Sequence, residues 1–164
     1  MNPILSAGVL IGVLCGAWTF VMGLTGWYKD PAMSNVFFMV ILFEIGGLFW
    51  GLRRTAALGR NYGQQVMAGT MMAVIAGLII VATSLLFTMV AYPDYAAAVE
   101  SATRGALQRQ GKNEAEISAA LASNAASLTP MAQAMSGFIG TLITGIVASA
   151  AIGFVLHSKR TADR

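Results

Sequence analysis

Long apolar segments alternate with short polar connections along the chain, and each segment has the length of a membrane-spanning helix. The four segments are Ile4–Trp27, Val36–Leu52, Val66–Val90 and Ala134–His157. A helix needs about 20 mainly apolar residues to cross the hydrocarbon core of a bilayer, so each segment is expected to span a membrane. The pattern predicts an all-α integral membrane four-helix bundle that forms a single membrane domain over residues 1–164.

The composition agrees with this pattern. The chain is 57% hydrophobic and 10% charged, with a mean hydropathy of +0.70, which lies outside the usual range of soluble domains. The first segment is expected to be a retained span, because its start carries no Lys or Arg and its apolar region exceeds the ~7 to 15 residues of a signal peptide. Four spans leave no room for a soluble catalytic domain.

Basic residues near the ends of the spans predict the orientation, because they are retained on the cytoplasmic side of a membrane. They are Arg53, Arg54 and Arg60 in the second connection, and Lys159, Arg160 and Arg164 in the tail. Both termini are therefore expected to be cytoplasmic. The net charge of +3 is interpreted as this orientation signal, and no nucleic-acid partner is expected.

The long third connection, residues 91–132, is expected to be an extracytoplasmic helical hairpin. Asp94 can open a first helix that runs to about residue 110, and Gly111 can end it. Asn113 and Glu116 resemble a capping box at the start of a second helix, and Thr129 can cap the fourth span. An apolar stripe on the second loop helix is expected to lie against the outer membrane surface or the bundle: Ile117, Leu121, Ala125 and Leu128.

Small residues recur at four-residue steps in two spans and predict close helix packing. The glycines concerned are Gly8, Gly12 and Gly16 in the first span and Gly137, Gly145 and Gly153 in the fourth, where Thr141 and Ser149 complete the stripe. In lipid, such stripes let helix backbones approach closely. The partner helix can belong to the same bundle or to another subunit, and the sequence leaves both open.

Four runs of this sequence resemble a known family. They are NYGQQVMAGTMMAVIAGLI, AYPDYAAAVE, RQGKNEAEI and GFIGTLITGIVASAAIGFVLHSKR. Together they resemble the bacterial domain-of-unknown-function family numbered 4199, which consists of small four-span membrane proteins with a hydrophilic loop between the last two spans. The resemblance implies multi-pass insertion in the bacterial cytoplasmic (inner) membrane. It implies no activity, and the acidic residue and paired glycines frequent in the family's second connection are missing here.

Few residues offer the chemistry of a catalytic or metal site. The chain has one cysteine, Cys15, and one histidine, His157, so it cannot form an internal disulfide or a histidine–thiolate metal cluster. No phosphate-binding GxxxxGK loop occurs. We therefore expect no enzyme activity, no cofactor and no metal.

Glu44 is the exception, because it places a carboxyl group at the middle of the second apolar run. Gly47 and Gly51 share its helix face, which favours a position inside the bundle or at a subunit contact. An ionised carboxylate exposed to lipid at that depth costs about 3 kcal/mol on insertion scales. The spans contain no basic residue near it, so burial favours the protonated form. The polar residues expected at a similar depth are Thr19, Thr144 and Thr141.

Two hypotheses of different classes follow from this acid. In the first, the chain is a noncatalytic subunit or assembly component of a membrane complex, as a homo-oligomer or with a partner membrane subunit in the lipid bilayer. A single acid makes a poor relay, which favours this hypothesis. In the second, the chain is a small proton- or cation-coupled permeation protein in which Glu44 exchanges its proton, as intramembrane acids often do.

Overall fold

A computed structural model describes residues 2–30 and 33–162. Within these residues the chain forms helices and turns, with no β-strand. The α-helices are α1 (Pro3–Thr25), α2 (Met39–Ala57), α3 (Tyr62–Leu86), α4 (Tyr95–Arg109), α5 (Glu114–Ala125) and α6 (Pro130–Ala162). The side chains of His157, Lys159 and Arg160, and the whole of Arg164, lie outside the described part of the structure.

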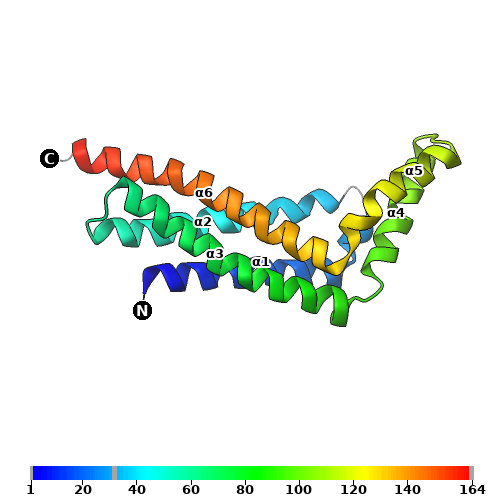
Figure 1. Cartoon of the computed structure of the whole chain (residues 1–164), viewed down its shortest axis with the longest axis horizontal. Helices are drawn as coiled ribbons and strands as arrows, with labels where there is room; N and C mark the ends of the chain where they lie inside the picture. The colour runs from blue at the N-terminus through cyan, green and yellow to red at the C-terminus, as the bar shows by residue number, and fades with distance from the viewer. Residues whose placement is uncertain (1, 31–32, 163–164) are drawn as a thin grey trace.

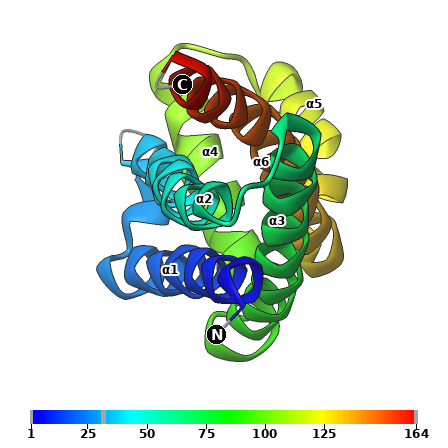
Figure 2. The ribbon, with the colours of Figure 1, turned by 90° about the vertical axis from the view of Figure 1, so that its left-hand side faces the viewer.

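The four longest helices lie side by side as a bundle (Figures 1 and 2). α3 contacts α1, α2 and α6, and α2 contacts α1 and α6 as well. The start of α1 and the end of α6 lie at one end of the bundle, together with the connection between α2 and α3, whereas α4 and α5 lie at the other end (Figure 1). All four bundle helices are long and apolar enough to cross a membrane. The predicted all-α fold with four candidate spans is confirmed.

Several helix boundaries differ from the expected spans. α1 ends at Thr25, α2 begins at Met39, and α3 begins at Tyr62, four residues before the apolar segment. The second span was expected to end at Leu52, but α2 continues through Arg53 and Arg54 to Ala57. Arginine and alanine are good helix formers, and an arginine stem can lie along an apolar surface while its head reaches water. The helix therefore continues beyond the end of the apolar run. α6 likewise begins at Pro130, four residues before the apolar segment.

The connection between α3 and α6 forms the expected helical hairpin. Gly111 ends the first helix with a positive φ of 76°, a conformation that favours glycine. Asn113 and Glu116 form the predicted capping box, and the Thr129 hydroxyl accepts a hydrogen bond from the backbone N–H of Ala132 at 3.3 Å. Each of these helix ends is therefore set by the residue expected from the sequence.

The apolar stripe of α5 is used inside this hairpin. Ile117 and Leu121 are buried, and α5 makes its main contacts with α4 and with the short turn Ala126–Leu128. Arg104 of α4 also forms an ion pair with Glu114 of α5. The hairpin projects away from the bundle axis (Figure 1), so the stripe covers α4 and not the bundle helices.

Close contacts fix how α3 packs against α1. A Cβ added at Gly8 would lie 2.7 Å from the Cβ of Ile75, and one added at Gly12 would lie 2.7 Å from the Cβ of Ile79. At Gly16 it would lie 2.9 Å from the side chain of Thr83. These distances are too short for a real side chain. The glycine face of α1 is therefore covered by α3 of the same chain.

Candidate functional site

Glu44 lies near the middle of the second candidate span and is turned into the bundle. Its side chain is only 4% exposed. A Cβ added at Gly145 of α6 would lie 3.3 Å from the Glu44 Oε1 atom and would also contact Ala73 of α3. Glu44 therefore reaches the contact between α3 and α6, at a point where glycine leaves room for a carboxyl group.

The surroundings of this carboxyl group supply little to pair with it. Within the described residues, Oε1 of Glu44 has no hydrogen-bond partner, and no ion pair to Glu44 is present in that part of the chain. α1 contributes the thiol of Cys15, which donates to the carbonyl of Val40 at 3.7 Å, one turn before Glu44. Residues 66–91 of α3 and its extension, and residues 130–156 of α6, contain no ionisable side chain.

A second unpaired polar group lies one helical turn away from Gly145. Ser149 of α6 is fully buried and, among the described residues, its hydroxyl oxygen has no hydrogen-bond partner. The hydroxyl points at Gly69 of α3, because a Cβ added there would collide with the Ser149 Oγ atom. Leaving a buried hydroxyl unpaired costs about 1 to 3 kcal/mol, so this position is not optimised for stability alone.

A third such group follows one further turn along α6. Gln65, in the first turn of α3, is 2% exposed, and its Cβ lies 3.4 Å from a Cβ added at Gly153. The Thr55 hydroxyl of α2 donates to Gln65 Oε1 at 2.7 Å. The Nε2 atom of Gln65, however, has no partner within the described part of the chain.

We call Thr55, Gln65, Ser149 and Glu44 the polar column. Its levels coincide with Gly153, Ser149 and Gly145 of α6, which are four residues apart and therefore about 6 Å apart along the helix axis. That rise exceeds the length of a direct hydrogen bond. The column extends over eight residues of α6, about 12 Å, from Glu44 to the α2–α3 end of the bundle.

The other predicted polar residues take different places. The Thr19 hydroxyl donates to the Cys15 carbonyl of its own helix at 3.1 Å. Thr144 is half-buried on α6, next to Gly145, and Thr141 is buried one turn beyond Gly145 toward the hairpin. Sequence reasoning missed Gln65 and Thr55 and treated Ser149 only as a small residue. A signal was present, because Gln65 lies four residues before Gly69 and Ser149 belongs to the four-residue stripe of α6.

Between Glu44 and the hairpin, the bundle interior contains aromatic rings. Trp18 and Phe43 meet edge to face with ring centroids 5.7 Å apart. Near the end of α3, Phe87 contacts Phe20 at 5.6 Å and Tyr92 at 4.6 Å. Phe87 begins a π-helical turn, Phe87–Ala91, that ends the third span. We call Phe20, Tyr28, Phe87, Tyr92 and Tyr95 the aromatic cluster.

Tyr95 connects this cluster to α4. Its ring lies 5.0 Å from that of Tyr28 and 5.5 Å from that of Phe87, measured between centroids. Burial and the neighbouring Tyr28 raise the pKa of the Tyr95 hydroxyl above its usual range. The phenol therefore stays neutral at physiological pH, and the cluster closes this end of the bundle with uncharged rings.

Four membrane-length helices around a buried acid define a small multi-pass membrane protein. The family model described as "Protein of unknown function (DUF4199)" matches residues 6–158. The chain therefore belongs to this family, as the four quoted runs predicted. No curated protein and no solved structure matches the chain. Because a fold does not by itself determine a function, the argument for function has to come from the polar column.

Proposed function

We propose that this chain is a small proton-coupled permeation protein in which Glu44 binds and releases the proton. The observation that carries this proposal is the buried, unpaired Oε1 atom of Glu44 at the inner end of the polar column. Intramembrane acids that face the interior of a bundle commonly mark proton or ion pathways. The remaining members of the column give this acid a route to one end of the bundle.

The column has the composition of a proton route. Carboxyl and hydroxyl groups can accept and release a proton, as a chain of proton transfers requires, whereas the carboxamide of Gln65 can hold a water in place by donating and accepting hydrogen bonds. Two members besides Glu44 retain unused hydrogen-bonding atoms, Ser149 Oγ and Gln65 Nε2, within the described residues. These atoms can be satisfied by water, which buried polar groups in proteins commonly bind.

We further propose that the column opens to the cytoplasmic side of a bacterial cytoplasmic membrane. Arg53, Arg54 and Arg60 lie in or beside the last turns of α2, at the end of the bundle where the column begins. Basic residues next to spans are retained on the cytoplasmic side. In this arrangement Glu44 exchanges protons with the cytoplasm, and the aromatic side of the bundle sets the barrier that a permeating proton has to cross.

The subunit hypothesis has less support from the packing. Its motive was that Glu44 has no second functional group with which to form a relay, and it used the glycine stripes as contact surfaces. Gly8, Gly12 and Gly16 face α3, and Gly145 faces Ala73 and Glu44 of the same chain. These surfaces are therefore already covered, so they offer no contact area to another subunit.

Proton flux into liposomes that contain the purified protein tests the proposal. A pH-sensitive dye inside the vesicles reports the flux under an imposed pH gradient, with a potassium ionophore to balance charge. We expect measurable flux with the native sequence and a loss of at least about tenfold with Glu44→Gln, which corresponds to 1.4 kcal/mol in the barrier. Glu100→Gln, which changes an exposed acid of α4, is the matched control and is expected to leave the flux unchanged.

Equal flux through the native and Glu44→Gln proteins would refute the proposal. Absence of flux from both, together with a stoichiometric membrane partner after purification in mild detergent, would support the subunit hypothesis instead. Infrared spectroscopy gives a second readout. The carbonyl band of a protonated acid is expected to disappear in Glu44→Gln and to respond to bath pH in the native protein.

A further inference from the structure

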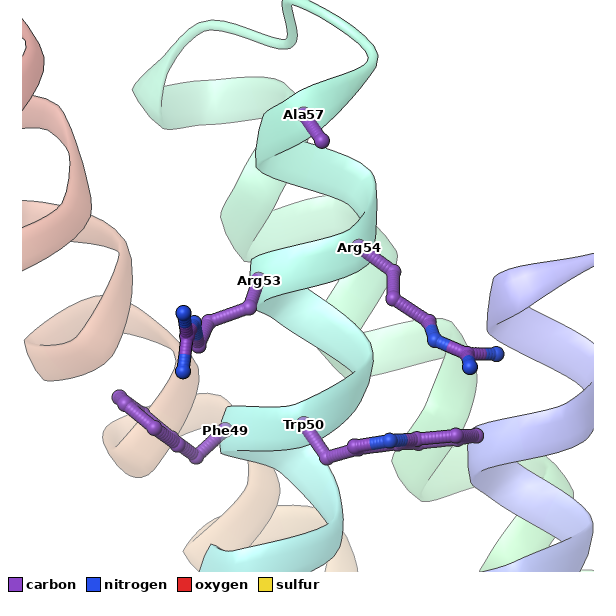
Figure 3. Close-up of a pocket in the computed structure, with 5 residues that line it drawn as sticks. All are labelled: Phe49, Trp50, Arg53, Arg54 and Ala57. Carbon is purple, nitrogen blue, oxygen red and sulfur yellow. The ribbon is translucent and has the colours of Figure 1, made fainter.

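The last turns of α2 form a shallow pocket on the outer surface of the bundle. It has a volume of about 360 Å³ and is lined by Phe49, Trp50, Arg53, Arg54 and Ala57. Figure 3 shows the two arginines directed to opposite sides of the helix, Arg53 toward Phe49 and Arg54 over Trp50. The guanidinium carbon of Arg54 lies 4.0 Å from the centre of the Trp50 ring, and that of Arg53 lies 5.7 Å from the Phe49 ring.

Among the described residues, neither guanidinium group has an acidic partner. The two ion pairs within the described residues join the hairpin residues Arg104 to Glu114 and Lys112 to Glu116. Glu44, the acid of the same helix, is buried in the bundle. Two adjacent positive charges are thus fixed by aromatic rings and left available to an anion. Their charge also exceeds the partial negative charge of about one half at a helix C-terminus.

The position of the pocket favours a lipid over a soluble ligand. It occupies the last turns of the candidate span Asn35–Ala57. Tryptophan is enriched at membrane–water interfaces, and arginine near a helix end extends toward the headgroups. The guanidinium groups are therefore expected at the depth of the phospholipid phosphates.

The surface beside the pocket suits an acyl chain. Gly46 lies one turn before Trp50, and a Cβ added at Gly46 would meet nothing within 4 Å. Leu42 and Ile45 are exposed on the preceding turn. An apolar surface with a glycine notch thus adjoins two cations, which is the arrangement a phospholipid with a negatively charged headgroup requires.

We propose that this face of α2 binds an anionic phospholipid, with its headgroup in the pocket that Arg53 and Arg54 flank and an acyl chain over Gly46. A guanidinium group binds phosphate oxygens through two parallel hydrogen bonds, so either arginine can fix the phosphate while the other adds attraction for the negative charge. The site is separate from the polar column, so this proposal stands or fails independently of the role of Glu44.

Native mass spectrometry of the delipidated full chain in neutral detergent tests the site. The probes are phosphatidylglycerol and phosphatidylcholine with identical acyl chains. We expect preferential binding of phosphatidylglycerol, and about a fivefold loss of that binding with either Arg53→Gln or Arg54→Gln. Arg60→Gln removes the same charge three residues after the helix ends and is expected to change binding by less than about twofold.

Two further measurements distinguish a phospholipid site from nonspecific lipid contact and from a site for a soluble phosphate. Gly46→Leu fills the notch without changing charge or disturbing the bundle, and it is expected to weaken phosphatidylglycerol binding. Soluble glycerol phosphate is expected not to compete. Equal binding of the two lipids, equal effects of Arg54→Gln and Arg60→Gln, unchanged binding by Gly46→Leu, or full competition by glycerol phosphate would each overturn the proposal.

Discussion

Between Glu44 and the α2–α3 connection, the bundle interior holds Ser149, Gln65 and Thr55 beside apolar core residues such as Leu48, Leu52 and Met72, whereas between Glu44 and the hairpin it holds aromatic rings. The rings stabilise their half, because a favourable aromatic pair contributes about 0.5 to 1.5 kcal/mol beyond its buried area. The polar side chains of the other half do not add stability in the same way, since a buried polar atom costs about 1 to 3 kcal/mol unless water or another group pairs with it.

Because of this difference, a contribution to stability accounts for the aromatic side chains but does not account for Ser149. Replacing Ser149 by alanine would remove an unpaired hydroxyl and keep the close approach of α3 and α6. Such a replacement is stabilising on physical grounds, yet the serine is present. A buried hydroxyl in line with a buried acid is what the proposed proton route requires.

The largest expected effect comes from removing the central ring of the aromatic half. Phe87 is 3% exposed and contacts Phe20, Tyr92 and Tyr95, so Phe87→Ala is expected to lower the free energy of unfolding by about 3 kcal/mol. Unfolding in mild detergent followed by circular dichroism measures it. The neighbouring Leu86→Ala, at a half-exposed position, should cost less than about 0.5 kcal/mol. Similar losses from both variants would show that the cluster does not stabilise this half.

A smaller loss of stability is expected when a side chain is added at the close contact between α3 and α6 in the polar half. A Cβ at Gly69 would collide with Ser149, and Gly69→Ala is expected to cost about 2 kcal/mol. Adding Ser149→Gly should restore most of that loss, because it removes the colliding side chain. Gly137→Ala is the control in the aromatic half, since its Cβ would meet only the Ile80 Cγ2 atom at 3.1 Å. If the double variant did not regain stability, the loss in Gly69→Ala would not come from the collision with Ser149.

The sequence predicted the elements that depend on local signals. Four apolar runs, the Asn113–Glu116 capping box and Gly111 at the end of α4 each depend on residues close together in the chain, and the structure contains all of them. The end of α2 was misplaced because hydropathy stops at Leu52, whereas helix formation continues through Arg53.

The candidate site was only partly predictable, because its members come from three helices. Glu44 stood out as the one acid in an apolar run. Gln65 and Thr55 lie close to the predicted span ends, where polar residues are common, and only the four-residue step from Gln65 to Gly69 indicated that Gln65 faces another helix. Their contact across α2 and α3 depends on how the helices rotate and pack, which the glycine stripes restrict without specifying the partner.

A change in proton flux with little change in stability is expected at Ser149. Ser149→Ala breaks the polar column one turn from Glu44 and is expected to lower proton flux about tenfold, equivalent to 1.4 kcal/mol, while stability stays equal or rises. Thr141→Val is the control, because Thr141 lies one turn from Gly145 on the side of the aromatic rings. Equal flux in the two variants would mean that protons do not reach Glu44 through the polar half.

The smallest effect is expected in the hairpin, outside both halves of the bundle. A hydrogen bond from the Asn113 backbone, followed by the interaction with Lys112, lowers the pKa of Glu116 below its usual range. A carboxyl group with a depressed pKa in the folded state contributes stability that is present above its ordinary pKa and is lost as the pH falls through the folded value. Acidification into that range should therefore lower the protection of the amides in the first turn of α5, measured as their exchange rate relative to the intrinsic rate at the same pH. Glu116→Gln should abolish the pH dependence of that protection without altering proton flux, whereas a change in flux would link the hairpin to Glu44.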